Sequence, residues 1–331
     1  MGVIVALALV VFAPIASAQS DAAGQYGHKT VHEVMSDVDQ WKLPLLGVAT
    51  LLVLALLLAG GLLKPGGFEK AGARDLGPVP WMIWIFAALV VLLAMYSAKG
   101  VLTATGAFDK LGGEGGLTDA QTDVVTTLGA YALGGIAGLG MLFVLHKSAP
   151  AAGLRLSGLD APLGFGCFLL AFPIVQLSAI GAFALYKSVT QGDQPDPIAH
   201  AVLRSIRDQF AGGTQDMWTW LTIAAAVIGA PIVEELIYRI FLQSALLKLF
   251  KSPWVSIIVT ALIFAGMHRI ASDPKAAVPW HALIPLFTLG VTMGVAYERT
   301  RRVGVPIVMH MCFNALMIAL VVLGADSPAP N

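Results

Sequence analysis

The stretch Pro231-Ile232-Val233-Glu234-Glu235-Leu236-Ile237-Tyr238-Arg239 places two adjacent carboxylates and a guanidinium in one of the most apolar parts of the sequence. Residues 224–228 before it and 240–242 after it are all apolar. Ionisable groups are costly inside a bilayer, so they are rare there and usually functional. On a helix, Glu235 and Arg239 share a face and are expected to neutralise each other. Glu234 is turned about 100° away, which leaves it as the uncommitted carboxylate.

The composition is typical of a membrane protein. The chain has 331 residues, of which 57% are hydrophobic and only 12% are charged, whereas soluble domains carry about 25% charged residues. Apolar runs of about 20 residues, the length that crosses a bilayer as a helix, recur along the sequence. These features predict an all-α, polytopic membrane helix bundle. The net charge is zero, so nothing indicates a nucleic-acid partner.

The first 42 residues are expected to precede the membrane spans. Residues 1–18 resemble a secretory signal peptide, because an apolar run leads to Ala16-Ser17-Ala18, a pattern typical of a cleavage site. The segment before the run lacks Lys and Arg, so a retained first membrane helix is the alternative. Residues 19–42 are polar and are predicted to form an extracytoplasmic segment.

About eight spans are predicted after this segment. Residues 43–216 contain four of them with polar loops between, residues 217–323 form the membrane core with the charged motif, and residues 324–331 form a short polar tail. Pro231 should kink the fifth helix just before the carboxylates. Residues 118–121 match a capping box that should begin the third helix, and Gly134 and Gly138 form a small-residue face for close packing. The spans cover residues 43–63, 79–97, 124–145, 162–186, 217–250, 254–268, 281–297 and 305–323.

Loop charges predict the orientation in the membrane. If the mature N-terminus lies outside the cytoplasm, eight crossings place four basic segments in the cytoplasm and the acidic loop at 98–123 outside, as the positive-inside rule requires. The signal-like N-terminus indicates a bacterial inner membrane, so the expected setting is multi-pass in that membrane, with its lipids as partners. The four basic segments are residues 64–74, 147–155, 248–251 and 299–302.

Three further polar side chains lie in the apolar C-terminal third: His268, His310 and Asn314. Each alone is more typical of helix packing, but together with Glu234, on three helices, they are harder to explain in that way. The set suits amide hydrolysis, because a Glu can deprotonate water, a His can protonate the leaving amine, and a His and an Asn can donate to an oxyanion. Glu234, His268 and His310 also match a catalytic zinc site of the His₂Glu type.

In this order on apolar helices, three motifs resemble the CPBP family, the CAAX prenyl-protease and bacteriocin-processing intramembrane endopeptidases. They are Glu-Glu-x-x-x-Arg at 234–239, Phe-x-x-x-His at 264–268 and His-x-x-x-Asn at 310–314, and the resemblance covers residues 217–323. It implies a helical core around a water-filled cavity. By this resemblance Glu234 and His268 activate the water, His310 and Asn314 form the oxyanion site, and Glu235 and Arg239 support it.

The resemblance leaves the use of a metal open, because the family has been described both as metalloproteases and as glutamate proteases. Metal-independent catalysis is favoured, since an Asn beside the second His suits an oxyanion donor better than a zinc ligand. No cofactor is therefore expected, and zinc held by Glu234, His268 and His310 is the alternative.

Three classes of function are compatible with these residues. The first is an intramembrane endopeptidase that cleaves a peptide or a membrane protein. The second is a non-catalytic membrane scaffold or bacteriocin-immunity-type protein that keeps the motif residues for stability or binding. The third is a transporter in which Glu234 and the histidines relay protons or an ion. Paired repeat halves with matched broken helices, which would favour a transporter, are not recognisable in the sequence.

Overall fold

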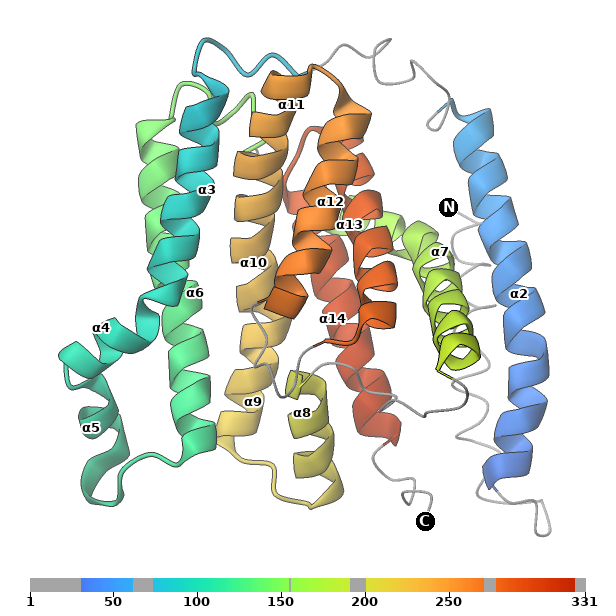
Figure 1. Ribbon diagram of the computed structural model, residues 1–331, viewed down its shortest axis with the longest axis horizontal. Coiled ribbons are helices and arrows are strands. Elements are labelled where there is room, and N and C mark those ends of the chain that lie inside the picture. The colour runs from blue at the N-terminus through green and yellow to red at the C-terminus, as the bar shows by residue number, and fades with distance from the viewer. Residues whose placement is uncertain (1–30, 62–73, 155, 191–200, 271–277, 325–331) are drawn as a thin grey trace.

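A computed structural model describes residues 31–61, 74–154, 156–190, 201–270 and 278–324 (Figure 1). All regular elements in these ranges are helical, so the all-α prediction is confirmed. In chain order they are α2 (Val31–Ala59), α3 (Trp81–Tyr96), α4 (Ala98–Ala104), α5 (Ala107–Gly112), η2 (Gly113–Gly115), α6 (Asp119–Val144), α7 (Asp160–Val189), α8 (Ala201–Ala211), α9 (Met217–Ala224), η3 (Ala225–Gly229), α10 (Ala230–Glu235), η4 (Leu236–Gln243), α11 (Ser244–Phe250), α12 (Pro253–Ile270), α13 (Trp280–Thr300) and α14 (Gly304–Gly324).

The described helices form a polytopic bundle, as predicted. Six of them are long and apolar enough to cross a membrane, and α3 with α4, bent by 47°, adds a seventh if the pair counts as one span. The apolar part of α2, Pro44–Ala59, is shorter, so the number eight stays a prediction. The signal-like segment and the polar tail fall on residues 1–30 and 325–331, outside the described residues, whereas residues 31–42 are helical and continue into the apolar part of α2.

Helix α6 begins where the sequence predicted. The side chain of Thr118 accepts a hydrogen bond from the backbone N–H of Gln121 at 3.3 Å, and the Gln121 side chain accepts one from the backbone N–H of Thr118 at 3.0 Å. A similar pair, Asp216 and Thr219, begins α9. There, the hydrogen bond from the Thr219 backbone N–H holds the pKa of the Asp216 carboxyl below its ordinary value.

The small-residue face of α6 packs inside the molecule, against α3 and α10. A Cβ at Gly134 would lie 2.6 Å from Cγ of Met95 and 3.1 Å from Cγ1 of Val233, and a Cβ at Gly138 would lie 3.3 Å from Cδ1 of Leu236. The close approach of these helices therefore depends on the missing side chains. It sets α6, from the first half of the chain, against the helix with the two adjacent carboxylates.

The helix that carries the charged motif is one candidate span of 34 residues, Met217–Phe250. Two π-helical segments, η3 and η4, flank its α10 section. Pro231 lies at the start of α10, directly after η3. A proline ring clashes with the carbonyl four residues earlier in a regular α-helix, and a π-helical turn relieves this geometry. Where the sequence predicted a kink, the structure thus has a wider turn within a continuous helix.

The described basic segments gather at one end of the bundle, at the top of Figure 1. There Nζ of Lys248 donates to the carbonyl of Gly77 at 2.5 Å, and the N–H of Val303 donates to the carbonyl of Gly153 at 2.9 Å. Arg302, in the turn between α13 and α14, forms an ion pair with Asp160 at the start of α7. The acidic segment with α4 and α5 lies at the opposite end. This separation is what the predicted orientation needs, with all basic segments on one side.

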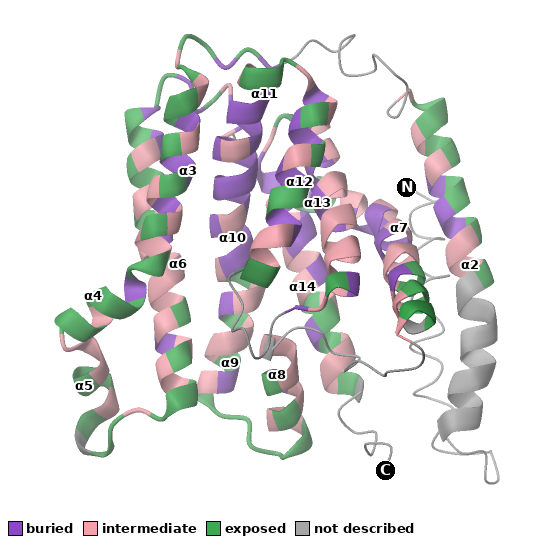
Figure 2. Cartoon of the chain, viewed as in Figure 1, coloured by how far each residue is buried: buried purple, intermediate pink, exposed green. Residues whose placement is uncertain are grey.

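The buried core runs through the C-terminal helices. Figure 2 shows buried residues concentrated on α10, α11 and the neighbouring α12, while α3 and α6 have many exposed positions. Aromatic rings tie α7 to α14, with the Phe168 and Phe313 centroids 4.9 Å apart. Phe241 and Phe264 are fully buried on η4 and α12. Glu235, Arg239 and His310 are buried in this apolar interior, whereas Glu234, His268 and Asn314 are half-buried.

Candidate active site

The predicted site residues lie on three segments of the C-terminal core. Glu234 and Glu235 end α10, and Arg239 lies one turn further in η4. His268 lies near the end of α12. His310 and Asn314 lie on α14, which contacts α10 and η3, while η4 contacts α12.

Glu235 is at the centre of this arrangement. One of its carboxylate oxygens accepts a hydrogen bond from Nε of Arg239 at 2.7 Å, and the other lies 3.2 Å from Nδ1 of His310. Glu235 and Arg239 are completely buried, and His310 is 4% exposed. The ion pair of Glu235 with Arg239 was predicted, but its contact with His310 was not. Because an ionised carboxylate only accepts, Nδ1 of His310 carries the proton here, and Nε2 can meet another group.

Phe264 connects the two histidines. Its ring centroid lies 4.6 Å from that of His268 and 5.9 Å from that of His310, and both contacts are T-shaped. Nδ1 of His268 lies 2.8 Å from the carbonyl oxygen of Phe264 and donates to it, because a carbonyl only accepts. The Phe-x-x-x-His motif thus fixes the His268 ring and supplies an apolar wall for both imidazoles.

Glu234 has different surroundings from its neighbour. Its Oε2 is buried and has no hydrogen-bond partner in the part of the chain that the structure describes. Tyr238, one turn later, and Tyr131 of α6 are close enough to be influenced by its charge. The Tyr131 ring packs against the backbone of Gly229, where a Cβ would lie 3.0 Å from ring carbon Cδ2. The structure therefore also leaves Glu234 uncommitted, and it adds an unpredicted phenol from outside the C-terminal core.

Asn314 ties α14 to the helix of the carboxylates. Its Nδ2 donates to the carbonyl of Ala226 in η3 at 2.8 Å. A π-helical turn changes the regular backbone hydrogen bonding, so a carbonyl there can accept from a side chain. The amide of Asn314 has a second N–H, which such a bond leaves for another acceptor.

The zinc alternative requires at least three ligand side chains close together. Within the described ranges, no three or more side chains of His, Cys, Asp and Glu are grouped so that they could hold a metal ion. Glu234, His268 and His310 therefore do not fit a three-ligand zinc site as they stand.

Sequence reasoning missed a set of buried polar residues that continues from Arg239. Nη1 of Arg239 donates to Oε1 of Gln243 at 3.4 Å, and Nε2 of Gln243 donates to Oε1 of Glu298 at 3.0 Å. Glu298 also accepts two hydrogen bonds from Arg74, at 2.7 and 3.0 Å. Gln243 could have been predicted as a member of this set, because it is a polar residue in an apolar run, four residues after Arg239. Arg74 was noted only as part of a basic loop.

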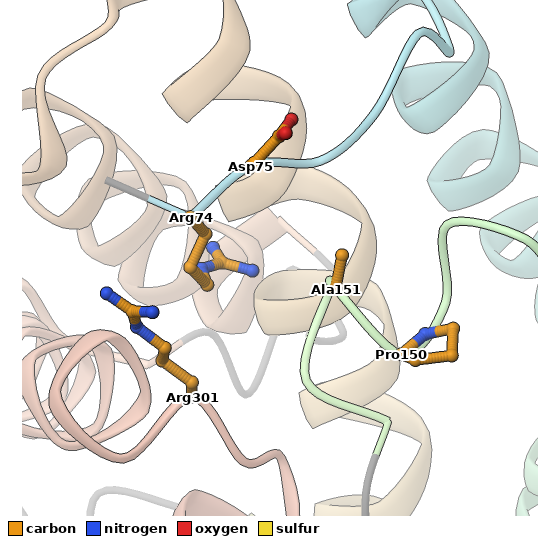
Figure 3. A pocket seen from close by; sticks show the side chains of 5 residues that line it. All are labelled: Arg74, Asp75, Pro150, Ala151 and Arg301. Carbon is orange, nitrogen blue, oxygen red and sulfur yellow. The ribbon is translucent and has the colours of Figure 1, made fainter. Parts of the chain in front are cut away.

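A cavity of about 260 Å³ lies at the basic end, away from the motif residues (Figure 3). Segments far apart in the sequence line it, and Arg74 and Arg301 approach it from different segments. Its lining residues are Arg74, Asp75, Pro150, Ala151 and Arg301, and no predicted site residue is among them.

Comparison with known proteins assigns the C-terminal region. Residues 216–316 match the family model described as type II CAAX prenyl endopeptidase Rce1-like. This region is similar to that family and is referred to as the Rce1-like domain. It contains every residue of the three motifs, so the family resemblance predicted from them is confirmed for this region. Arg74 and Tyr131 lie outside it.

A curated relative also matches part of the chain. The UPF0177 protein YaiH of Lactococcus lactis subsp. lactis (strain IL1403) is 28% identical over 116 residues, which are 35% of this chain and 44% of that protein. The match therefore spans less than half of the relative. No solved structure matches the chain significantly.

Proposed function

We propose that this protein is an intramembrane endopeptidase that hydrolyses a peptide bond with a water activated by Glu234 and His268. The observation that carries the proposal is the contrast between the adjacent carboxylates. Glu235 is bonded to Arg239 and His310, whereas Glu234 keeps a buried oxygen without a partner. A carboxylate oxygen in an apolar interior is costly to leave unpaired, and a water or substrate N–H would satisfy it. The Rce1-like match supports the reaction class.

In this mechanism Glu234 takes a proton from the water as the oxygen of that water attacks the substrate carbonyl carbon. With His310 doubly protonated, its Nε2 donates to the oxyanion that forms, and so does the second N–H of Asn314. When His310 is doubly protonated, Glu235 balances its charge. The C–N bond then breaks, and the proton held by Glu234 passes to the leaving amine with help from His268. The proposed mechanism uses no metal.

The test is cleavage of a membrane-peptide library by the purified full chain. Prenylated C-terminal peptides are included because the matched family is described by that substrate. Glu234→Gln is the matched variant, since it removes the charge with little change in shape, and each assay is run with and without a strong chelator. We expect cleavage that Glu234→Gln abolishes and the chelator leaves intact.

Other outcomes favour other functions. Loss of cleavage with chelator as well as in Glu234→Gln would indicate a metal-dependent enzyme. A fully active Glu234→Gln variant would overturn the proposal. Peptides that bind equally to the wild type and to Glu234→Gln, without being cut, would favour the membrane scaffold.

A further inference from the structure

Six side chains form a buried polar network from the candidate active site to the basic end of the bundle. Each is hydrogen-bonded to the next, and none is more than 7% exposed. In order they are His310, Glu235, Arg239, Gln243, Glu298 and Arg74. The first five lie in the Rce1-like domain, and Arg74 comes from the segment before α3, outside it.

Gln243 gives the network a direction. Arginine only donates hydrogen bonds and a carboxylate only accepts them, so the amide oxygen of Gln243 must face Arg239 and its NH₂ must face Glu298. The NH₂ also lies 3.3 Å from the carbonyl of Gly294 on α13. A Cβ at Gly294 would lie 3.2 Å from the Gln243 amide oxygen, so the missing side chain at Gly294 makes room for Gln243. Glu298 is thus the charged acceptor that holds the NH₂ of Gln243, beside the Gly294 carbonyl, and Gln243 holds Arg239 at a second point.

Arg74 holds Glu298 in turn. Its guanidinium donates to both carboxylate oxygens of Glu298, to the hydroxyl of Tyr297 at 2.8 Å and to the hydroxyl of Ser244 at 3.0 Å. Burial disfavours the charge of Arg74, but Tyr297 and Glu298 outweigh this effect and hold its pKa above the ordinary value. With two guanidiniums and two carboxylates, the network is balanced in charge.

We propose that Glu298 and Arg74 are positioning residues for the candidate active site: through Gln243 they fix the Arg239 guanidinium, and so the Glu235 carboxylate that holds His310. The proposal rests on the proposed function, in which His310 belongs to the peptidase site. It gives the N-terminal region a direct part in that site, because Arg74 lies outside the Rce1-like domain. Neither Glu298 nor Arg74 touches the reacting atoms.

The test reads the position of His310 without requiring cleavage. The full chain is labelled with ¹⁵N-histidine, and the downfield N–H resonance of the His310–Glu235 hydrogen bond is assigned by its loss in His310→Gln. Glu298→Met removes the carboxylate that accepts from the NH₂ of Gln243, so we expect this resonance to shift or disappear. Asp160→Asn is the matched control, because it breaks another ion pair at the same end of the bundle, that of Asp160 with Arg302. It should leave the resonance unchanged.

The double variant Arg74→Met/Glu298→Met separates positioning from charge balance and stability. It removes one charge of each sign, so it avoids the unpaired, buried Arg74 that Glu298→Met alone would leave. Because Gln243 still lacks the Glu298 carboxylate, we expect the resonance to stay displaced. A wild-type resonance in the double variant would overturn the proposal, whether or not the single variant folds.

Activity provides a second readout once a substrate is known. Loss of a residue that positions a catalytic imidazole through other side chains should lower kcat by about tenfold with KM little changed, in both Glu298→Met and the double variant. A displaced resonance in a protein that cleaves nothing would support the positioning role and refute the peptidase. Cleavage with an unchanged resonance would support the peptidase and refute the positioning role.

Discussion

Two adjacent residues of the same chemical type have opposite surroundings in this protein. On a helix they are turned about 100° apart. Glu235 contacts Arg239 and His310, whereas Glu234 has Tyr131 and Tyr238 in its neighbourhood. A buried charge is tolerated where it is paired and bonded. Glu235 meets this condition and has a structural role, whereas the unpaired oxygen of Glu234 fits a group that meets water or substrate.

This difference predicts opposite effects of the same substitution on stability. Glu235→Gln leaves the buried Arg239 without its anion, which should cost about 3–5 kcal/mol of unfolding free energy. Glu234→Gln breaks no hydrogen bond seen here and should change it by less than about 1 kcal/mol, although we expect it to abolish cleavage. Reversible unfolding of the two variants in detergent, followed by circular dichroism, measures both values. Equal losses would show that Glu234 is as firmly paired as Glu235.

At the scale of helices, the packing of α6 on α10 joins the N-terminal region to the candidate site. Gly134 and Gly138 let the two helices approach, and Tyr131, one turn before Gly134, reaches the neighbourhood of Glu234 by the same packing. Either side of α10, the helix is π-helical. The close contact of α6 therefore falls where the main helix departs from regular geometry.

Overpacking this contact should destabilise the bundle. Gly134→Leu would place a side chain where a Cβ already lies 2.6 Å from Met95, and such overpacking typically costs about 1–3 kcal/mol. Gly140→Leu is the matched control on the same helix, because nothing lies within 4 Å of a Cβ there. Thermal unfolding in detergent should give a lower midpoint for Gly134→Leu than for Gly140→Leu. Equal unfolding midpoints would mean that α6 moves away from α10 without loss of stability.

The sequence predicted elements better than it predicted contacts between them. Five of the eight expected spans lie wholly within the described helices, and the spans at 43–63, 79–97 and 124–145 extend beyond the ends of α2, α3 and α6. The pairing of Glu235 with Arg239 follows from their spacing alone. The contact of Arg74 with Glu298 joins residues 224 positions apart, and no helical period contains that information. The π-helical turns were not predicted for a related reason, since a period of 3.6 residues describes only regular α-helices.

At the scale of the whole molecule, the described basic segments 147–154, 248–251 and 299–302 lie at one end of the bundle with Arg74, whereas the other end carries both signs, with the acidic segment around α5 and with Arg204 and Arg207 on α8. The described basic segments are tied together at one end by the Lys248–Gly77, Arg302–Asp160 and Arg74–Glu298 contacts. The acidic segment around α5 lies at the other end. Because cytoplasmic loops carry an excess of Lys and Arg, the network would open toward the cytoplasm at Arg74, and the candidate site would lie deeper in the membrane.

Cysteine labelling in intact bacterial cells tests this orientation. Lys147 and Asp109 are both exposed and lie in a basic and an acidic segment. Each is changed to Cys in a background where the two native cysteines, Cys167 and Cys312, are replaced by alanine. A maleimide that cannot cross membranes should label Asp109→Cys in intact cells if the acidic segment faces outward, as the positive-inside rule predicts. Lys147→Cys should react only after permeabilisation, which also shows that the thiol is accessible. Labelling of Lys147→Cys alone in intact cells would reverse the orientation and place the Arg74 end of the network outside.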